Sequence, residues 1–429
     1  MRQVRQVRSA RSVCSTDEVV GGTVGALTLD KIEYYSTSVP RTRRTVENDA
    51  LITCLSSNGK TTTEGDGPAT VLLVATIAGV HIFERAAIGA TWSLRHPALT
   101  DLHISALLRE PRSGLLLAGA HGDGGLWGSL DEGRTWSPRS RGLRSKHVYT
   151  LALQYRDDRA VLFAGTEPSA LYRSDDLGLS WHELPALTSV PDTELWTFPP
   201  PPHIAHVKNV SFHPSEPETL YVCIEQGALL KSTDDGQSWF EESGYDSSDD
   251  KFRHDNHRVL IKPSNPSALF MCGGEGLYAS NDAGRTWEHL TDRSHRVGYP
   301  DAMFIDPRDE NVLYMAGPRH APMHWGETGA ADPTVMRSTD GGRHWDEIRD
   351  GLPARIVGNI EAMGLYRWSD RVMLIAGTAT GEVFACENAG ERWEPVAEGL
   401  PPISKGGHYR WFLSASQREA IEARMRQGA

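Results

Sequence analysis

The chain has 429 residues, with 44 Lys and Arg against 56 Asp and Glu, and a formal net charge of −12. This acidic balance argues against binding to nucleic acid or to an anionic membrane surface, and no stretch is apolar for long enough to span a bilayer. The five cysteines are odd in number and scattered. They favour a reducing compartment over a disulfide framework, so we expect a cytoplasmic protein.

The two ends of the chain differ from its middle. Residues 1–65 are polar, and their first arginines precede any acid without the apolar core of a secretory signal. We expect this N-terminal extension to be partly disordered, with weak strands at 24–35 and 50–55. Residues 415–429 are expected to form a short C-terminal helix or tail.

Between these ends, over residues 66–414, a short phrase that closes with Trp recurs seven times. Its fullest copies read Ser-x-Asp-x-Gly-x-Thr-Trp and occupy residues 129–136 and 280–287. The closing tryptophans stand at positions 92, 136, 181, 239, 287, 345 and 393. A period in the forties to fifties is that of a propeller blade and is too long for a leucine-rich or helical repeat. The spacing therefore predicts an all-β protein, a seven-bladed β-propeller of four-stranded blades.

The phrase resembles the Asp-box, or BNR repeat, of sialidases, sortilin-type receptors, xyloglucan hydrolases and photosystem assembly factors. The resemblance implies that Asp or Asn caps a tight turn, that Gly takes a positive φ and that Trp packs between blades. The stretch 164–174 looks like the single-chain bacterial Asp-box propellers described as glycosyl hydrolase-like. The Arg-Ile-Pro phrase of sialidases is missing, so we do not expect sialidase activity.

The third repeat illustrates the expected blade. Residues 147–153, 161–165 and 170–174 fit three successive strands, and a fourth starts after Trp181. Closing the ring requires one more inner strand for the first blade, and residues 407–413 occupy the corresponding register. We therefore expect the C-terminal strand to close the ring and to remove the exposed sheet edges.

Strand direction separates the two faces of such a propeller. The repeated phrase lies between the third and fourth strands of each blade, so all copies share one face. The two longest insertions, residues 190–202 and 318–327, both fall on the opposite face. Because function often resides in loops on a rigid scaffold, we expect a ligand site at the channel mouth opposite the repeats.

Histidines recur at the starts of the inner strands. His103, His147 and His206 lie 33 or 34 residues before the Trp of their blade, and His257 lies 30 before its own. Imidazoles from separate blades, oriented by nearby acids, suit a divalent transition metal. These four histidines are therefore candidate metal ligands. The alternative is that each imidazole only bonds a neighbouring loop carbonyl.

Two glutamates complete the candidate site. Glu167 and Glu225 each lie seven residues before the Ser of the repeat, so they occupy equivalent positions in neighbouring blades. Two carboxylates across a cleft can act as acid and base, or as acid and nucleophile, in glycoside cleavage. His206 or His257 together with Tyr299 would instead supply acid–base catalysis in a hydrolase or lyase. All five residues are candidate catalytic residues.

Two hypotheses of function remain open. The first is a glycosyl hydrolase-like or other small-molecule hydrolase or lyase, with or without a histidine-bound metal, that is a monomer or weak oligomer. The second is a non-enzymatic protein-interaction or assembly scaffold, in which the proline-rich loop 190–205 makes contacts. A binding module should tolerate His206→Ala and Glu225→Ala, whereas an enzyme should not.

Overall fold

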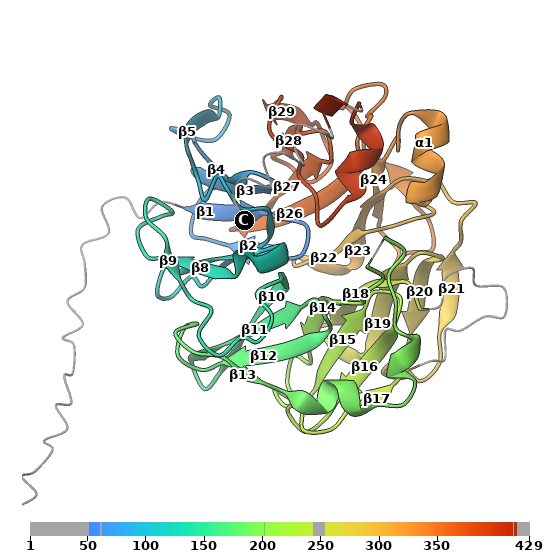
Figure 1. The fold of residues 1–429 in the computed structure, drawn as a ribbon. Helices are drawn as coiled ribbons and strands as arrows, with labels where there is room; N and C mark the ends of the chain where they lie inside the picture. The colour runs from blue at the N-terminus through green and yellow to red at the C-terminus, as the bar shows by residue number, and fades with distance from the viewer. Residues whose placement is uncertain (1–50, 61, 201, 243–253, 415, 418–429) are drawn as a thin grey trace, which may run out of the picture. The chain divides into compact units, whose positions relative to one another are not determined.

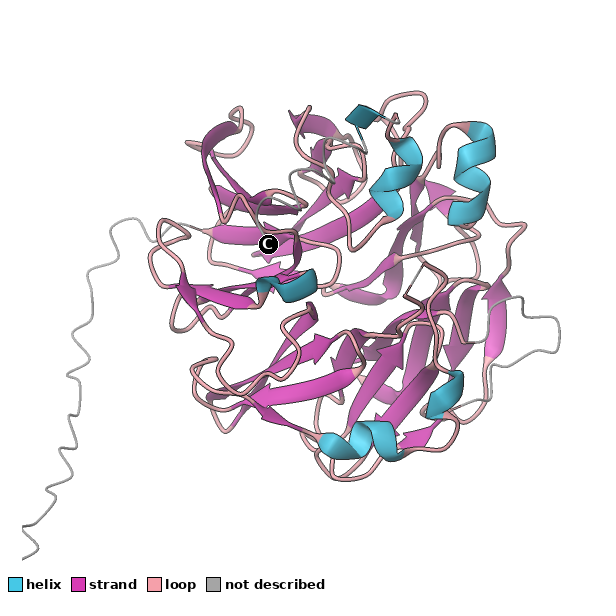
Figure 2. Cartoon of the chain, in the orientation of Figure 1, coloured by secondary structure: helices cyan, strands magenta, loops and turns pink. Residues whose placement is uncertain are grey.

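The computed structural model describes residues 51–60, 62–200, 202–242, 254–414 and 416–417. Over these residues the chain is all-β, and strands dominate the fold (Figure 2). Seven sheets succeed one another in chain order, and each inner strand contacts the inner strands of its two neighbours, so the ring is closed (Figure 1). The predicted seven-bladed propeller is confirmed.

Blades two to four each consist of four antiparallel strands, ordered from the channel outward. They are β6 (Ile104–Arg109), β7 (Leu116–Ala120), β8 (Leu126–Ser129) and β9 (Ser137–Pro138); β10 (Val148–Arg156), β11 (Arg159–Thr166), β12 (Ala170–Ser174) and β13 (His182–Glu183); and β14 (Val207–Phe212), β15 (Leu220–Ile224), β16 (Ala228–Ser232) and β17 (Phe240–Glu241). The strands expected for the third repeat are therefore present.

Blades five to seven repeat this arrangement. Their strands are β18 (Asn256–Lys262), β19 (Asn265–Gly273), β20 (Gly276–Ser280) and β21 (Glu288–Thr291); β22 (Ala302–Asp306), β23 (Asp309–Gly317), β24 (Thr334–Ser338) and β25 (Asp346–Glu347); and β26 (Ile360–Trp368), β27 (Arg371–Thr378), β28 (Val383–Cys386) and β29 (Glu394–Ala397).

The first blade corrects the expected ring closure. Its strands are β3 (Val71–Thr76), β4 (Gly79–Glu84) and β5 (Ser93–Ala98), and the inner strand is β1 (Ile52–Leu55), which pairs in parallel with β3. The C-terminal segment that was expected to close the ring forms instead the 3₁₀ helix η5 (His408–Phe412). All four residues of β1 are buried, and β1 covers the inner edge of β3, which would otherwise be exposed.

The chain after β1 also belongs to the propeller, although we had assigned it to an N-terminal extension ending at residue 65. It crosses the channel, where the amide of Asn58 bonds the carbonyl of Ser105 and its carbonyl accepts from Thr150 Oγ1. It then forms β2 (Thr62–Glu64), which pairs in parallel with β26 of blade seven. A Cβ on Gly59 would lie 1.9 Å from the carbonyl oxygen of Leu107, so only glycine permits this approach.

The core lies between the blades. Seven clusters of buried apolar side chains occur in the described chain, and each joins neighbouring blades. Trp181, for example, belongs to a cluster formed by blades two and three. The apolar side chains of each blade are therefore buried by packing against a neighbouring blade, as in other repeat architectures.

The repeated phrases form nearly identical turns, which we call the repeat turns. In the turn of blade two, the hydroxyl of Ser129 donates to Asp131 Oδ1 at 2.8 Å and accepts from the amide of Gly133 at 2.9 Å. Asp131 also accepts the amide and hydroxyl of Thr135, and Gly133 has a φ of 84°. The same bonds recur from Ser174, Ser232, Ser280 and Ser338. The turns are therefore a local structural device.

The insertions lie on the face opposite the repeat turns. The 3₁₀ helix η2 (Pro185–Ser189) precedes the first insertion, which contains the 3₁₀ helix η3 (Thr193–Leu195). The second insertion contains η4 (Pro322–His324) and most of the α-helix α1 (Trp325–Thr328). A further 3₁₀ helix, η1 (Gly122–Gly124), lies between β7 and β8. The strand expected at 24–35 lies outside the described residues, and the helix expected near the C-terminus falls almost entirely outside them. No helix in the described parts of the chain is long and apolar enough to cross a membrane.

Candidate functional site

The inner strands bring a network of buried charges together at the channel mouth opposite the repeat turns. Glu225 lies at its centre: Oε2 accepts from His206 Nε2 at 2.7 Å, and Oε1 accepts from Lys405 Nζ at 3.2 Å. Lys208 Nζ lies 3.3 Å from Glu225 and 3.2 Å from Asp301, and Lys405 also donates to Asp301. Two buried lysines therefore face two buried carboxylates.

These contacts decide which groups are charged. Burial opposes the ionisation of Glu225, but Lys208 and Lys405 outweigh it and hold the pKa of this carboxyl well below its usual range. For Lys405, Asp301 and Glu225 likewise outweigh burial and raise the pKa of the amine. A buried ion pair survives only when its members satisfy one another in this way.

The other predicted glutamate joins the same network. Glu167 lies between two imidazoles, with 3.3 Å from Oε1 to His147 Nδ1 and 3.3 Å from Oε2 to His206 Nδ1. Despite partial burial, these contacts lower the pKa of Glu167 to about 2. His206 thus bridges Glu167 and Glu225, which are both ionised. Glycoside cleavage by two carboxyl groups needs one of them to be protonated. Because Glu167 and Glu225 are both ionised, they are better suited to holding neighbouring positive charges than to donating a proton.

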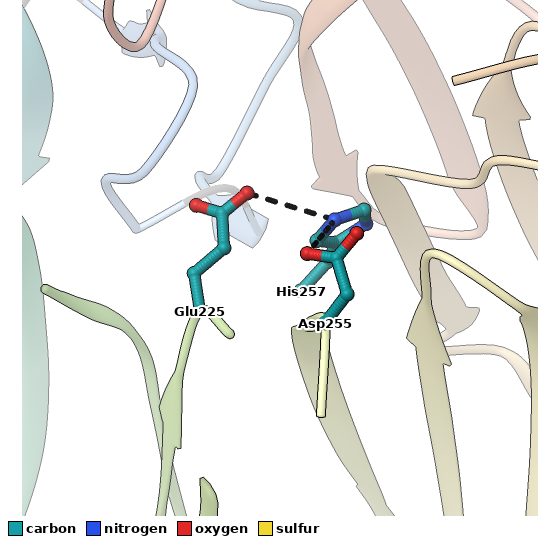
Figure 3. Close-up of side chains that lie close together, drawn as sticks. All are labelled: Glu225, Asp255 and His257. Carbon is teal, nitrogen blue, oxygen red and sulfur yellow. Dashed lines mark ion pairs between the residues drawn. The ribbon is translucent and has the colours of Figure 1, made fainter. Parts of the chain in front are cut away.

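His257 stands between two carboxylates (Figure 3). Its Nδ1 bonds the carbonyl of Pro300 at 2.7 Å, which directs Nε2 toward Asp255 Oδ1 at 3.3 Å and Glu225 Oε1 at 3.6 Å. Burial lowers the pKa of His257, but Asp255 more than compensates, and the net change is upward. Tyr299 contacts the ring edge-to-face, with 4.9 Å between centroids. The predicted proximity of His257 and Tyr299 is present.

The remaining candidate metal ligands are engaged differently. His103 Nε2 bonds the carbonyl of Ser404 at 2.7 Å, and its ring stacks on His121, which contacts His147. Burial lowers the pKa of His103 to about 4, so this imidazole is neutral. Of the four predicted histidines, only His257 belongs to a cluster of three or more metal-ligating groups in the described chain. That cluster also contains Glu225 and Asp255.

A cavity of about 450 Å³, the mouth pocket, opens beside this network. The two insertions and the C-terminal segment supply its apolar walls, and five polar side chains line it as well: Gln226, Asp255, Tyr299, His408 and Arg410. Its lining includes Phe198, Pro199, Pro200, Asp255, Tyr299, Pro322, Met323, His408, Arg410 and Trp411. An apolar pocket with a few convergent polar groups is the usual form of a small-molecule site.

His408 connects this pocket to a second acid. Its Nδ1 lies 3.3 Å from Glu361 Oε1, and the other oxygen of Glu361 accepts from the hydroxyl of Ser404 at 2.9 Å. Burial opposes the ionisation of Glu361, but His408 holds the pKa of the carboxyl below its usual value. One member of each of two acid–imidazole pairs therefore lines the pocket: Asp255, which is paired with His257, and His408, which is paired with Glu361.

Sequence reasoning missed the two lysines. Lys208 follows Val207 in the inner strand β14. A lysine is rarely found in a buried inner strand, and this is the signal that could have identified Lys208. Lys405 comes from a segment assigned to a loop before a closing strand, and nothing near it in sequence indicates its partners. Trp411 and His408 were placed on a strand, whereas the structure places both in η5 and in the pocket wall.

Comparisons with known proteins relate the chain to enzymes that act on xyloglucan. No family model matches. A xyloglucanase from Paenibacillus sp. is 24% identical over 295 residues, which are 58% of this chain and 27% of that protein. An oligoxyloglucan-reducing end-specific xyloglucanase from Emericella nidulans is 22% identical over 204 residues, 44% of this chain and 24% of that protein. The chain thus spans about a quarter of these relatives.

Solved structures support the fold. The GH74 enzyme of Niastella koreensis matches with a TM-score of 0.54 and 18% identity, covering 80% of this chain and 55% of that one. An ancestral GH74 enzyme matches with a TM-score of 0.52 and 16% identity, covering 69% of this chain and 39% of that one. At these identities the likeness establishes the propeller fold alone.

Proposed function

We propose that this propeller is a glycosidase-like hydrolase that binds a carbohydrate in the mouth pocket. The observation that carries the proposal is the convergence of both insertions and the C-terminal segment around two acid–imidazole pairs. The apolar and aromatic walls, which include Phe198, Tyr299 and Trp411, suit the apolar faces of sugar rings. The similarity to xyloglucanases supports this class of ligand.

The two pairs suggest a division of roles. Asp255, held against His257, is the carboxylate that accepts a proton from the attacking water as its oxygen bonds to the anomeric carbon. His408, which is paired with Glu361, donates a proton to the departing glycosidic oxygen as the carbon–oxygen bond breaks. Burial raises the pKa of Tyr299 well above its usual value, so its hydroxyl remains a hydrogen-bond donor. Glu167 and Glu225 hold the surrounding charges in place.

Hydrolysis and binding of a panel of oligosaccharides, beginning with xyloglucan fragments, test this function. General acid–base catalysis contributes about 10²–10⁴-fold, so Asp255→Asn and His408→Gln should lower kcat by that factor while calorimetric binding persists. Trp411→Ala should weaken binding instead. Asp346→Asn, on the outer strand β25, is the control and should change neither.

A scaffold would give the opposite pattern. If no oligosaccharide binds, or if Asp255→Asn and His408→Gln cleave as fast as the wild type, the hydrolase proposal is wrong. The protein-interaction hypothesis then becomes the better account of the insertions, because a binding surface should tolerate changes inside the pocket.

A metal-assisted hydrolase is a second candidate, favoured by one observation. Asp255 Oδ1 and His257 Nε2 are buried and lie 3.3 Å apart, and neither atom makes a hydrogen bond to another group in the described chain. His257 is also oriented through Nδ1, as metal-bound histidines are. Glu225 would be the third ligand, and the ion would activate a water. The ammonium of Lys405, 3.2 Å from the same Glu225 oxygen, competes with a cation there.

Elemental mass spectrometry separates these ligand sets. A stoichiometric transition metal that Asp255→Asn removes and His147→Ala/His206→Ala retains would support the set containing Glu225 and His257. Loss in the histidine double variant alone would support the predicted four-histidine set. Wild-type protein that added metals do not fill would contradict both.

A further inference from the structure

A second cavity, of about 530 Å³, lies on the other side of the second insertion and is unusually basic for so acidic a chain. We call it the arginine pocket. Three arginines and two histidines line it, and the only acid among its lining residues is Asp332. The basic residues are Arg296, Arg319, His320, His324 and Arg355.

Ion pairs neutralise only one of the three guanidinium groups. Arg296 lies 3.4 Å from Asp332 and 3.3 Å from Glu347. Arg355 donates to the carbonyl of Thr328 at 2.9 Å, and neither Arg355 nor Arg319 has a carboxylate partner among the described residues. Two positive charges therefore face the same cavity without a matching acid. The chain as a whole has a net charge of −12, so this local excess of positive charge does not follow from the overall composition.

The arginine pocket and the mouth pocket share one segment of chain. His320, His324 and Trp325 line the arginine pocket, whereas the intervening residues 321–323 line the mouth pocket. The indole of Trp325 contacts the ring of His408 edge-to-face, with 5.6 Å between centroids. A ligand in the mouth pocket that extends around this insertion would bring its next unit toward the arginines.

We propose that the arginine pocket binds an anionic group of the ligand, with Arg319 and Arg355 as its main donors, and that the substrate is therefore an acidic carbohydrate. The carbohydrate part rests on the proposed function, whereas the anion site does not. A planar guanidinium donates two parallel hydrogen bonds to a carboxylate, sulfate or phosphate oxygen pair, which lysine cannot do. A uronic acid, a sulfated sugar and a phosphorylated sugar share this chemistry.

Calorimetry with matched ligands tests the inference. Trigalacturonic acid and its methyl ester have the same chain with and without charge, and inorganic sulfate and phosphate probe the anion site alone. The acid should bind the wild type about tenfold more tightly than the ester, since exposed ion pairs are individually weak. Arg319→Gln/Arg355→Gln should abolish this difference, and added salt should reduce it.

The control replaces two other exposed arginines. Arg343→Gln/Arg392→Gln removes the same charge from the repeat-turn face and should leave the preference intact. Equal binding of acid and ester, or equal loss in the control, would overturn the anion site. Binding of inorganic sulfate or phosphate that requires Arg319 and Arg355, without binding of either sugar, would support the anion site and contradict the carbohydrate function. Preference among the anions identifies the charged group.

Discussion

The two faces of the propeller are built from the same blades but follow different rules. On one face, five repeat turns make the same bonds, as from Ser129 to Asp131 and from Ser280 to Asp282. On the other, side chains from separate segments of the chain meet in one network, as Glu225, Asp301 and Lys405 do. The residues of the repeated phrase stabilise the turn of their own blade, whereas the side chains at the channel mouth make contacts between blades.

The largest expected difference between the faces concerns the buried charges. Lys405→Met would leave Lys208 as the one described lysine beside Glu225 and Asp301, and breaking such a buried pair costs about 3–5 kcal/mol of unfolding free energy. Lys262→Met is the matched control, because Lys262 bonds only the exposed side chain of Asn311, and should cost under about 0.5 kcal/mol. Urea denaturation measures both. Similar losses would show that the network adds no stability beyond that of an exposed pair.

A second experiment concerns which terminus closes the ring. Gly59→Ala places a Cβ 1.9 Å from the carbonyl oxygen of Leu107 and should destabilise the fold by about 1–3 kcal/mol. Gly407→Ala, in the segment that sequence analysis expected to close the ring, meets nothing nearer than 3.8 Å and should be nearly neutral. Thermal denaturation compares the two variants. A larger effect at Gly407 would favour closure by the C-terminal segment.

The smallest expected effect is acid sensitivity of the repeat turns. Hydrogen bonds from the turns lower the pKa values of Asp131 and Asp282 to about 2, below the value of about 3.9 expected for the unfolded chain. Their contribution is therefore present above about pH 4 and is lost as the pH falls through about 2. Asp131→Asn/Asp282→Asn should flatten this part of the stability profile.

Urea midpoints between pH 6 and pH 2 provide the comparison. The double variant at Asp346 and Asp370, two exposed aspartates outside the turns, is the control and should follow the wild type. A wild-type profile that the turn variants leave unchanged would show that these aspartates do not contribute to acid lability.

Sequence analysis was most successful where the information is local. The spacing of seven tryptophans predicted the number of blades, and strand direction correctly placed both insertions opposite the repeat turns. The structure brings His206 to Glu225 and His257 to Tyr299, which sequence analysis had grouped as candidate catalytic residues at the channel mouth. Ring closure was misassigned to residues 407–413, which had a suitable register, because β1 pairs with β3 as the inner strand whereas residues 408–412 form η5.

The number and kind of blades can be predicted from the residues alone, because each repeat turn is encoded within eight consecutive residues and its hydrogen bonds need no distant partner. The site depends instead on contacts between distant segments. Lys405 and Glu225 are 180 residues apart and meet because the ring brings the C-terminal segment back over the channel mouth. Low-dielectric burial then determines which of these groups keep their charge, and this depends on every neighbour at once rather than on any one segment.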